Sequence, residues 1–106
     1  MKILVFDTET TGLPEKDAPI IAVHRWPHIV QLSYLIFDTN ENKIIESFDN
    51  IIKLPEEIKI SPESENIHRI SNEIVKDKGL DIHELLINFN NKLSQVDLIV
   101  AHNIIF

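Results

Sequence analysis

Two carboxylates near the start of the chain, Asp7 and Glu9, have the spacing best suited to chemistry. They follow a run of apolar residues, 3–6, which predicts a strand buried on both faces. Side chains at positions i and i+2 of a strand point to the same face, so both acids should project together. Two anions held this close repel each other, and a divalent cation removes the repulsion. Mg²⁺ suits such a pair because it takes one or two carboxylates and completes its shell with water and phosphate oxygens.

The turn after this strand adds two hydroxyl groups and a glycine, at Thr10, Thr11 and Gly12. Hydroxyls can donate hydrogen bonds to phosphate or sugar oxygens, and glycine lets a backbone approach a ligand closely. The combination favours a ligand that carries such oxygens. An isolated Asp-x-Glu pair is more often a solvated strand end, so the interpretation depends on the whole stretch.

Two longer segments carry a family resemblance. Residues 6–14, FDTETTGLP, resemble the first motif of the DEDD exonucleases, which include the proofreading subunits of DNA polymerases. Residues 98–106, LIVAHNIIF, resemble the second motif, which in the family continues into an aspartate. Between them, Glu63 and residues 68–71 resemble a segment that touches the terminal nucleotide, although Arg69 stands where the family usually has glycine. A third motif, with a histidine and the fourth acid, has no counterpart here, so the resemblance covers the N-terminal part of a family domain.

The resemblance implies a ribonuclease H-like α/β fold and removal of nucleotides from 3′ ends with two Mg²⁺ or Mn²⁺ ions. Asp7 and Glu9 would be catalytic and would bind these metal ions. In such a mechanism one metal activates water and the other stabilises the leaving oxygen. The resemblance also implies a substrate-binding set that consists of Thr8, Thr10, Thr11, Gly12, Leu13, Glu63, His68, His102, Asn103 and Phe106. The partner would be the 3′ end of DNA or RNA, with a polymerase or the rest of the domain as a possible protein partner.

Each of these roles has a structural alternative. His102 and Asn103 could cap the junction between a strand and a helix, and His68 could be a surface histidine. Leu13 could belong to the core, and Phe106 is more typical of a core residue than of a ligand contact.

The elements that must position these residues follow from the hydrophobic pattern. We predict strands at residues 3–6, 28–38, 43–54 and 97–101, a helical turn at 61–63, and helices at 71–78 and 81–94. The first three strands should form an antiparallel meander. The last helix is a crossover, which allows the last strand to run parallel beside the first and brings His102 close to Asp7. The predicted fold is therefore α/β and truncated at its C-terminal end.

Composition sets further bounds. A chain of 106 residues allows one small domain, and 43% hydrophobic residues are enough for a core. No apolar run is long enough for a bilayer, no signal peptide is visible and there is no cysteine, so we expect an intracellular protein, from the cytoplasm of a prokaryote or a virus-infected cell. The net charge of −7 argues against binding to nucleic acid, unless bound cations neutralise the acids.

Three functions remain open. The first is the N-terminal part of a metal-dependent 3′–5′ exonuclease, and the second is a non-catalytic nucleic-acid-binding or interaction module with the same fold. The third is an unrelated α/β domain with an accidental acidic pair. We expect the isolated chain to be inactive and poorly stable, because it supplies two of four acids and its last strand leaves an edge unpaired.

Overall fold

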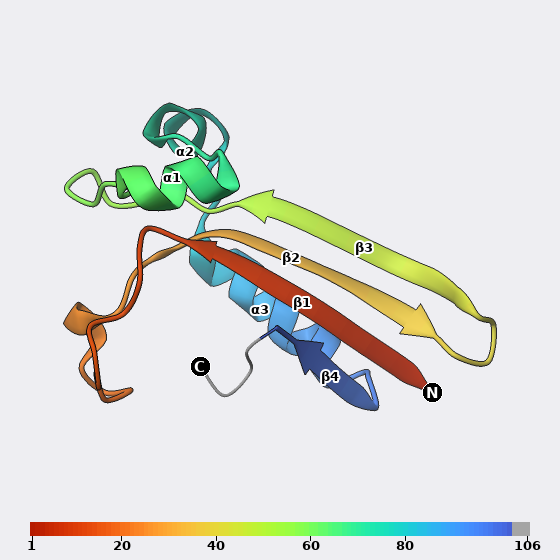
Figure 1. Ribbon diagram of the computed structural model, residues 1–106. Coiled ribbons are helices and arrows are strands. Elements are labelled where there is room, and N and C mark those ends of the chain that lie inside the picture. The colour runs from red at the N-terminus through yellow and green to blue at the C-terminus, as the bar shows by residue number, and fades with distance from the viewer. Residues whose placement is uncertain (103–106) are drawn as a thin grey trace.

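The computed structural model describes residues 1–102 as a four-stranded sheet with three short α-helices (Figure 1). In order, the elements are β1 (Lys2–Thr10), the 3₁₀ turn η1 (Val23–Arg25), β2 (Ile29–Asp38), β3 (Lys43–Ile51), α1 (Pro62–His68), α2 (Asn72–Lys78), α3 (Ile82–Leu93) and β4 (Leu98–Ala101). The strand order is β3-β2-β1-β4, with β4 parallel to β1 and the other pairs antiparallel. The predicted meander, crossover helix and parallel last strand are confirmed.

One face of the sheet packs against α3 and forms the main core. The alternating residues of β2 on this face are each at most 3% exposed, and they are Val30, Leu32, Tyr34 and Ile36. Phe89 of α3 lies against Phe6 and Tyr34, with ring centroids 5.3 Å apart in both pairs. Burial of side chains of this size contributes about 2 kcal/mol each.

The sequence encodes α3 in a capping residue and an apolar stripe. The Asp81 carboxylate accepts a hydrogen bond from the His83 amide at 2.7 Å, and this satisfies one of the free donors at the helix start. Near the other end, Lys92 pairs with Glu46 of β3 at 2.9 Å. The helix predicted at 81–94 is thus confirmed, and it lies across the strands on the core face (Figure 1). No helix within residues 1–102 is long and apolar enough to cross a membrane.

The opposite face, here called the open face, keeps apolar side chains in solvent. Val5 is 37% exposed, and its neighbours on β4, Leu98 and Val100, are 46% and 42% exposed. Within the described residues β4 pairs only with β1, so the predicted unpaired edge is confirmed there. This face is the one that carries the paired acids.

The helices α1 and α2 lie together at the end of the sheet where β1 and β3 finish (Figure 1). Ser61 caps α1 by accepting a hydrogen bond from the Ser64 amide at 3.2 Å, with Pro62 at the first helical position. Ser71 caps α2 in the same way through the Ile74 amide at 3.1 Å. The helical turn predicted at 61–63 is wrong in length, because α1 continues through seven residues.

The strand predicted at 43–54 is also too long, because β3 ends at Ile51. The next residue, Ile52, forms an isolated bridge with Leu80, and the backbone amide of Lys53 donates to the Leu80 carbonyl oxygen at 2.9 Å. The approach is so close that a Cβ on Gly79 would lie 2.7 Å from the Lys53 Cα and would also collide with the Val75 carbonyl oxygen. Glycine is therefore required there by contact between two backbones.

Candidate metal and nucleotide site

Asp7 and Glu9 lie on the open face near the end of β1. In the register with β2, Asp7 is opposite Ser33 and Glu9 is opposite Gln31. Asp7 is exposed and Glu9 is half-buried. The rise of a strand separates their Cα atoms by roughly 7 Å, and both carboxylates point to one side. The side-by-side placement predicted from the alternation is present.

A change in register follows these acids at once. Glu9 pairs with Gln31 but Thr10 pairs with Ile29, so Val30 is an additional residue on β2. Such a bulge bends the chain and increases the local twist. Val30 is fully buried, and its carbonyl oxygen accepts a hydrogen bond from Ile52 at 2.8 Å. The bulge is therefore fixed, and the pairing of β1 with β2 shifts by one residue directly after Glu9 and ends at Thr10.

Three polar residues extend the acidic pair across the open face. Asp49 of β3 is opposite Ser33, which is in turn opposite Asp7. The Ser33 hydroxyl and the Gln31 amide both donate to one Asp49 carboxylate oxygen, at 2.8 and 2.7 Å. This strip was not predicted from the sequence. The signal was the pair of polar residues at alternating positions within an otherwise apolar strand.

The turn after β1 is fixed by its own hydroxyl groups. The Thr10 hydroxyl donates to the Gly12 carbonyl oxygen at 2.7 Å. Thr11 is 8% exposed; its hydroxyl accepts from the His28 amide at 3.1 Å, and its carbonyl oxygen accepts from the Ser61 amide at 2.9 Å. These bonds make the two hydroxyls part of the turn, so a ligand at Thr10 and Thr11 meets a preformed backbone.

His68 links the last turn of α1 to the same segment. Its Nδ1 atom accepts a hydrogen bond from the Ile70 amide at 3.0 Å, and its Nε2 atom lies 3.0 Å from the Thr10 carbonyl oxygen. Because Nδ1 acts as an acceptor, the proton of the neutral ring is on Nε2, which donates to Thr10. His68 is half-buried with both ring nitrogens engaged, so it is not a free surface side chain, and its contact with a nucleotide stays a prediction.

Three other predicted substrate contacts, Leu13, Glu63 and Thr8, differ from His68 in exposure and in the face on which they lie. Leu13 is 86% exposed, so the alternative of a core residue is wrong. Glu63 is exposed in the first turn of α1. Thr8 alternates with Asp7 and Glu9, so its side chain lies on the α3 side of the sheet and only its backbone can face a ligand on the open side.

The second motif lies at the other side of β1. Ala101 pairs with Phe6, so His102, which is exposed, follows at the level where β1 reaches Asp7. The predicted proximity of His102 to the acids is in agreement with this register. The two remaining predicted contacts, Asn103 and Phe106, lie outside the described residues.

The donor set fits a hard divalent cation only in part. Carboxylate oxygens are the ligands that Mg²⁺ and Mn²⁺ prefer, and Asp7 and Glu9 supply two of them. Within residues 1–102 there is no group of three or more histidine, cysteine, aspartate or glutamate side chains that could hold a metal ion. The pair would therefore need further ligands from water or from phosphate.

A match to a family model identifies the family to which this chain belongs. The sequence matches the family model of RNase_T, described as exonuclease, over residues 4–106. The chain belongs to the RNase_T exonuclease family. Membership confirms the resemblance to DEDD exonucleases that the two end motifs indicate. A search of curated proteins found no match.

Solved structures of exonucleases share the fold of this RNase_T chain. Exonuclease X in complex with 5′ overhanging duplex DNA is 25% identical with a TM-score of 0.65, over 95% of this chain and 48% of that chain. E. coli exonuclease I in complex with a dT13 oligonucleotide is 18% identical with a TM-score of 0.74, over 96% and 20%. The nuclease domain of 3′hExo, a DEDDh family member bound to rAMP, is 15% identical with a TM-score of 0.66, over 94% and 50%. The chain thus spans half or less of each, and the ribonuclease H-like fold is confirmed.

Proposed function

We propose that this chain is the N-terminal, acid-bearing portion of a metal-dependent 3′–5′ exonuclease domain. The observation that carries the proposal is the position of Asp7 and Glu9, side by side on the open face at the end of β1. Directly after them comes a turn that is fixed by Ser61 and His68. Solved relatives with this sheet bind DNA or rAMP, which supports a nucleic acid 3′ end as the ligand.

The two acids would hold Mg²⁺ or Mn²⁺ through their carboxylate oxygens. When bound, the metal would supply activation of water and stabilisation of the leaving oxygen. The contribution of Asp7 and Glu9 is placement, since their backbone pairs with β2 and the residues just before them pair with both β2 and β4. A phosphate group that enters the site would complete the coordination shell.

The turn would hold the terminal nucleotide next to the metal. Its backbone at Thr10–Gly12 is fixed before a ligand arrives, and the exposed Leu13 offers an apolar side chain to a base. Burial of that side chain under a base would contribute about 1–2 kcal/mol. We further assign Glu63 and His102 to the rim of this site, and the family resemblance implies a substrate contact for Asn103 and Phe106, which lie outside the described residues.

The second candidate function is a non-catalytic module that binds nucleic acid without cleaving it. It is supported by the small number of metal ligands among the described residues, since no group of three or more histidine, cysteine, aspartate or glutamate side chains gathers within residues 1–102. The general base of the third motif has no counterpart in the sequence. We therefore expect the chain by itself to bind a metal and a 3′ end but to release no mononucleotides.

Binding to two matched oligonucleotides tests the proposal. A fluorescent oligonucleotide with a 3′-hydroxyl should bind more tightly when Mn²⁺ replaces EDTA, and one with a 3′-phosphate should show a smaller gain. Asp7→Asn should remove the gain, whereas Asp49→Asn, which neutralises an acid on the same face, should keep it. Equal gains in both variants would contradict the assignment. Release of mononucleotides by the wild type would reject the non-catalytic candidate.

A further inference from the structure

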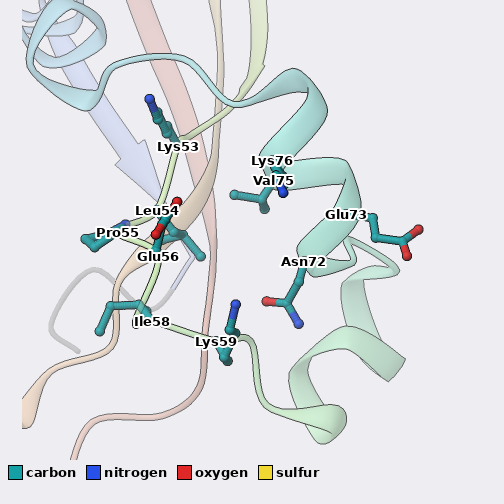
Figure 2. Close-up of a pocket in the computed structure, with 10 residues that line it drawn as sticks. All are labelled: Lys53, Leu54, Pro55, Glu56, Ile58, Lys59, Asn72, Glu73, Val75 and Lys76. Carbon is teal, nitrogen blue, oxygen red and sulfur yellow. The ribbon is translucent and has the colours of Figure 1, made fainter.

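A hollow lies away from the acids, between the segment that follows β3 and the helix α2 (Figure 2). Its volume is about 630 Å³. It is lined by Lys53, Leu54, Pro55, Glu56, Ile58, Lys59, Asn72, Glu73, Val75 and Lys76. The lining therefore combines an aliphatic surface with three lysines and two glutamates.

The walls of this hollow are fixed at both ends. At one end the backbone amide of Lys53 donates to the Leu80 carbonyl oxygen at 2.9 Å, and at the other the Ile60 amide donates to the Asn72 side-chain oxygen at 3.0 Å. Between them, Ile58 closes a turn by donating to the Pro55 carbonyl oxygen at 3.0 Å. The segment 53–60 is thus held against α2, so a ligand would not have to order it.

The charges in the hollow favour an anion. Within residues 1–102 the ion pairs use Arg25, Lys43 and Lys92, so the lysines of the hollow have no carboxylate partner within 4.0 Å. Figure 2 shows the Lys59 amine directed toward the space between the loop and α2, whereas Glu73 points away from it. The lining holds three lysines and two glutamates, Glu56 and Glu73, so positive charge exceeds negative charge there by one in a chain whose net charge is −7.

The floor of the hollow favours a ligand that also has an apolar part. Leu54 and Val75 face one another from the loop and from the helix (Figure 2), and both belong to the cluster around the buried Val30. Because Val75 is 4% exposed, the half-buried Leu54 offers most of the apolar surface. A base or sugar has such a surface, and its phosphate would meet the lysines.

The hollow is also close in the chain to the candidate site. Lys59 stands two residues before Ser61, which is hydrogen-bonded to Thr11, so the Cα atoms of Lys59 and Ser61 are at most about 8 Å apart. We propose that this hollow binds an internal nucleotide of the nucleic acid strand, through its phosphate at Lys59 and Lys76 and its base or sugar on Leu54 and Val75. The inference deepens the proposed function, on which it rests for the identity of the ligand as nucleic acid.

Salt-dependent binding of fluorescent dT12 in EDTA tests the inference without the metal site. The variant Lys59→Gln/Lys76→Gln should bind at least fivefold more weakly. Its negative slope of log affinity against log salt should become less steep by about 1.4, because two phosphate contacts are lost at about 0.7 each. The control Lys2→Gln/Lys43→Gln has the same change in charge at the opposite end of the sheet and should bind within twofold of wild type. Equal losses in the two variants would show an effect of net charge alone and would overturn the inference.

Further experiments identify the ligand and separate this inference from the proposed function. In NMR titrations dT12 should shift the amides of residues 53–59 and 72–76, and shifts confined to other residues would overturn the proposal. Inorganic polyphosphate and polyglutamate should bind at least threefold more weakly than dT12, and equal binding would contradict a contact with base or sugar. Asp7→Asn/Glu9→Gln should leave binding in EDTA at least as strong, so failure of the metal site would not remove it.

Discussion

The Nε2 atom of His68 donates to the carbonyl oxygen of Thr10 at 3.0 Å, across 58 positions of sequence. This bond joins the end of α1 to the residue that follows the paired acids. Together with the bond from Ser61 to Thr11, it fixes the path of the chain directly after Glu9. In this structure His68 acts on the site through the backbone that it holds.

Substitutions of His68 should therefore separate the effects of its two hydrogen bonds. In His68→Gln the amide nitrogen can replace Nε2 and keep the bond to Thr10, whereas in His68→Asn the oxygen can replace Nδ1 and keep the bond from Ile70. His68→Ala should lower the free energy of unfolding by about 1–2 kcal/mol, measured by urea denaturation. We expect His68→Gln, but not His68→Asn, to preserve the amide shifts of residues 9–12.

The tautomer of the His68 ring supplies the control for these variants. Long-range ¹H–¹⁵N spectra of the wild type at neutral pH should show the tautomer with the proton on Nε2. A proton on Nδ1, or a variant series in which His68→Asn preserves the turn better than His68→Gln, would contradict the arrangement.

Arg69 ends α1 in the left-handed region, with φ at 63°. An L residue with a side chain loses roughly 1 kcal/mol in this conformation, and glycine does not. Arg69→Gly should therefore raise the free energy of unfolding by about 0.5–1 kcal/mol, measured by urea denaturation. Arg69→Ala removes the charge but keeps the Cβ, and it should give no gain. If both variants change stability equally, the backbone conformation is not the cause.

Tyr34 should make stability sensitive to alkaline pH. Burial raises the pKa of its hydroxyl and nearby Glu46 adds to the rise, while Lys92 lowers it. Above pH 10, the usual value, the unfolded chain loses this proton while the folded chain keeps it, so the free energy of unfolding should fall as pH rises. The chain has one tyrosine, so the absorbance of phenolate reports this group alone.

The variant Tyr34→Phe isolates that contribution. The hydroxyl is buried with no hydrogen-bond partner among the described residues, so its removal should cost less than about 0.5 kcal/mol at pH 7 or should stabilise the fold. The difference in stability between wild type and variant should shift in favour of the variant above pH 10. A difference that does not change with pH would mean that Tyr34 titrates alike in both states.

The exposed edge of β4 should promote association of the isolated chain. Val100 is 42% exposed on the open face, and a lysine on an edge strand opposes pairing with another sheet. Val100→Lys should reduce the dimer or larger species seen by sedimentation velocity. Ile87→Lys, which changes a 65% exposed residue on α3, is the matched control and should leave association unchanged. A monomeric wild type would contradict this prediction.

Local sequence patterns predicted the helices and strands. The features that these patterns did not predict depend on tertiary contacts. The alternation that places Asp7 and Glu9 on one face survives in the structure because a strand has a fixed period of two. The face that α3 covers could not be predicted, since β1 and β2 carry apolar residues on both faces. The strip from Asp7 to Asp49 depends on the register between three strands, and a bulge at Ile36 and Phe37 shifts that register. The role of His68 depends on a contact with Thr10 that no local pattern encodes.

The central claim is that Asp7 and Glu9 bind a divalent metal together, and paramagnetic broadening by Mn²⁺ tests it most directly. In a ¹H–¹⁵N titration the strongest broadening should centre on residues 7–12 and should extend to Ser33, which is opposite Asp7. It should decrease at least fivefold in Asp7→Asn and persist in Asp49→Asn. Broadening centred elsewhere, or broadening at residues 7–12 that is unchanged in Asp7→Asn, would contradict the account.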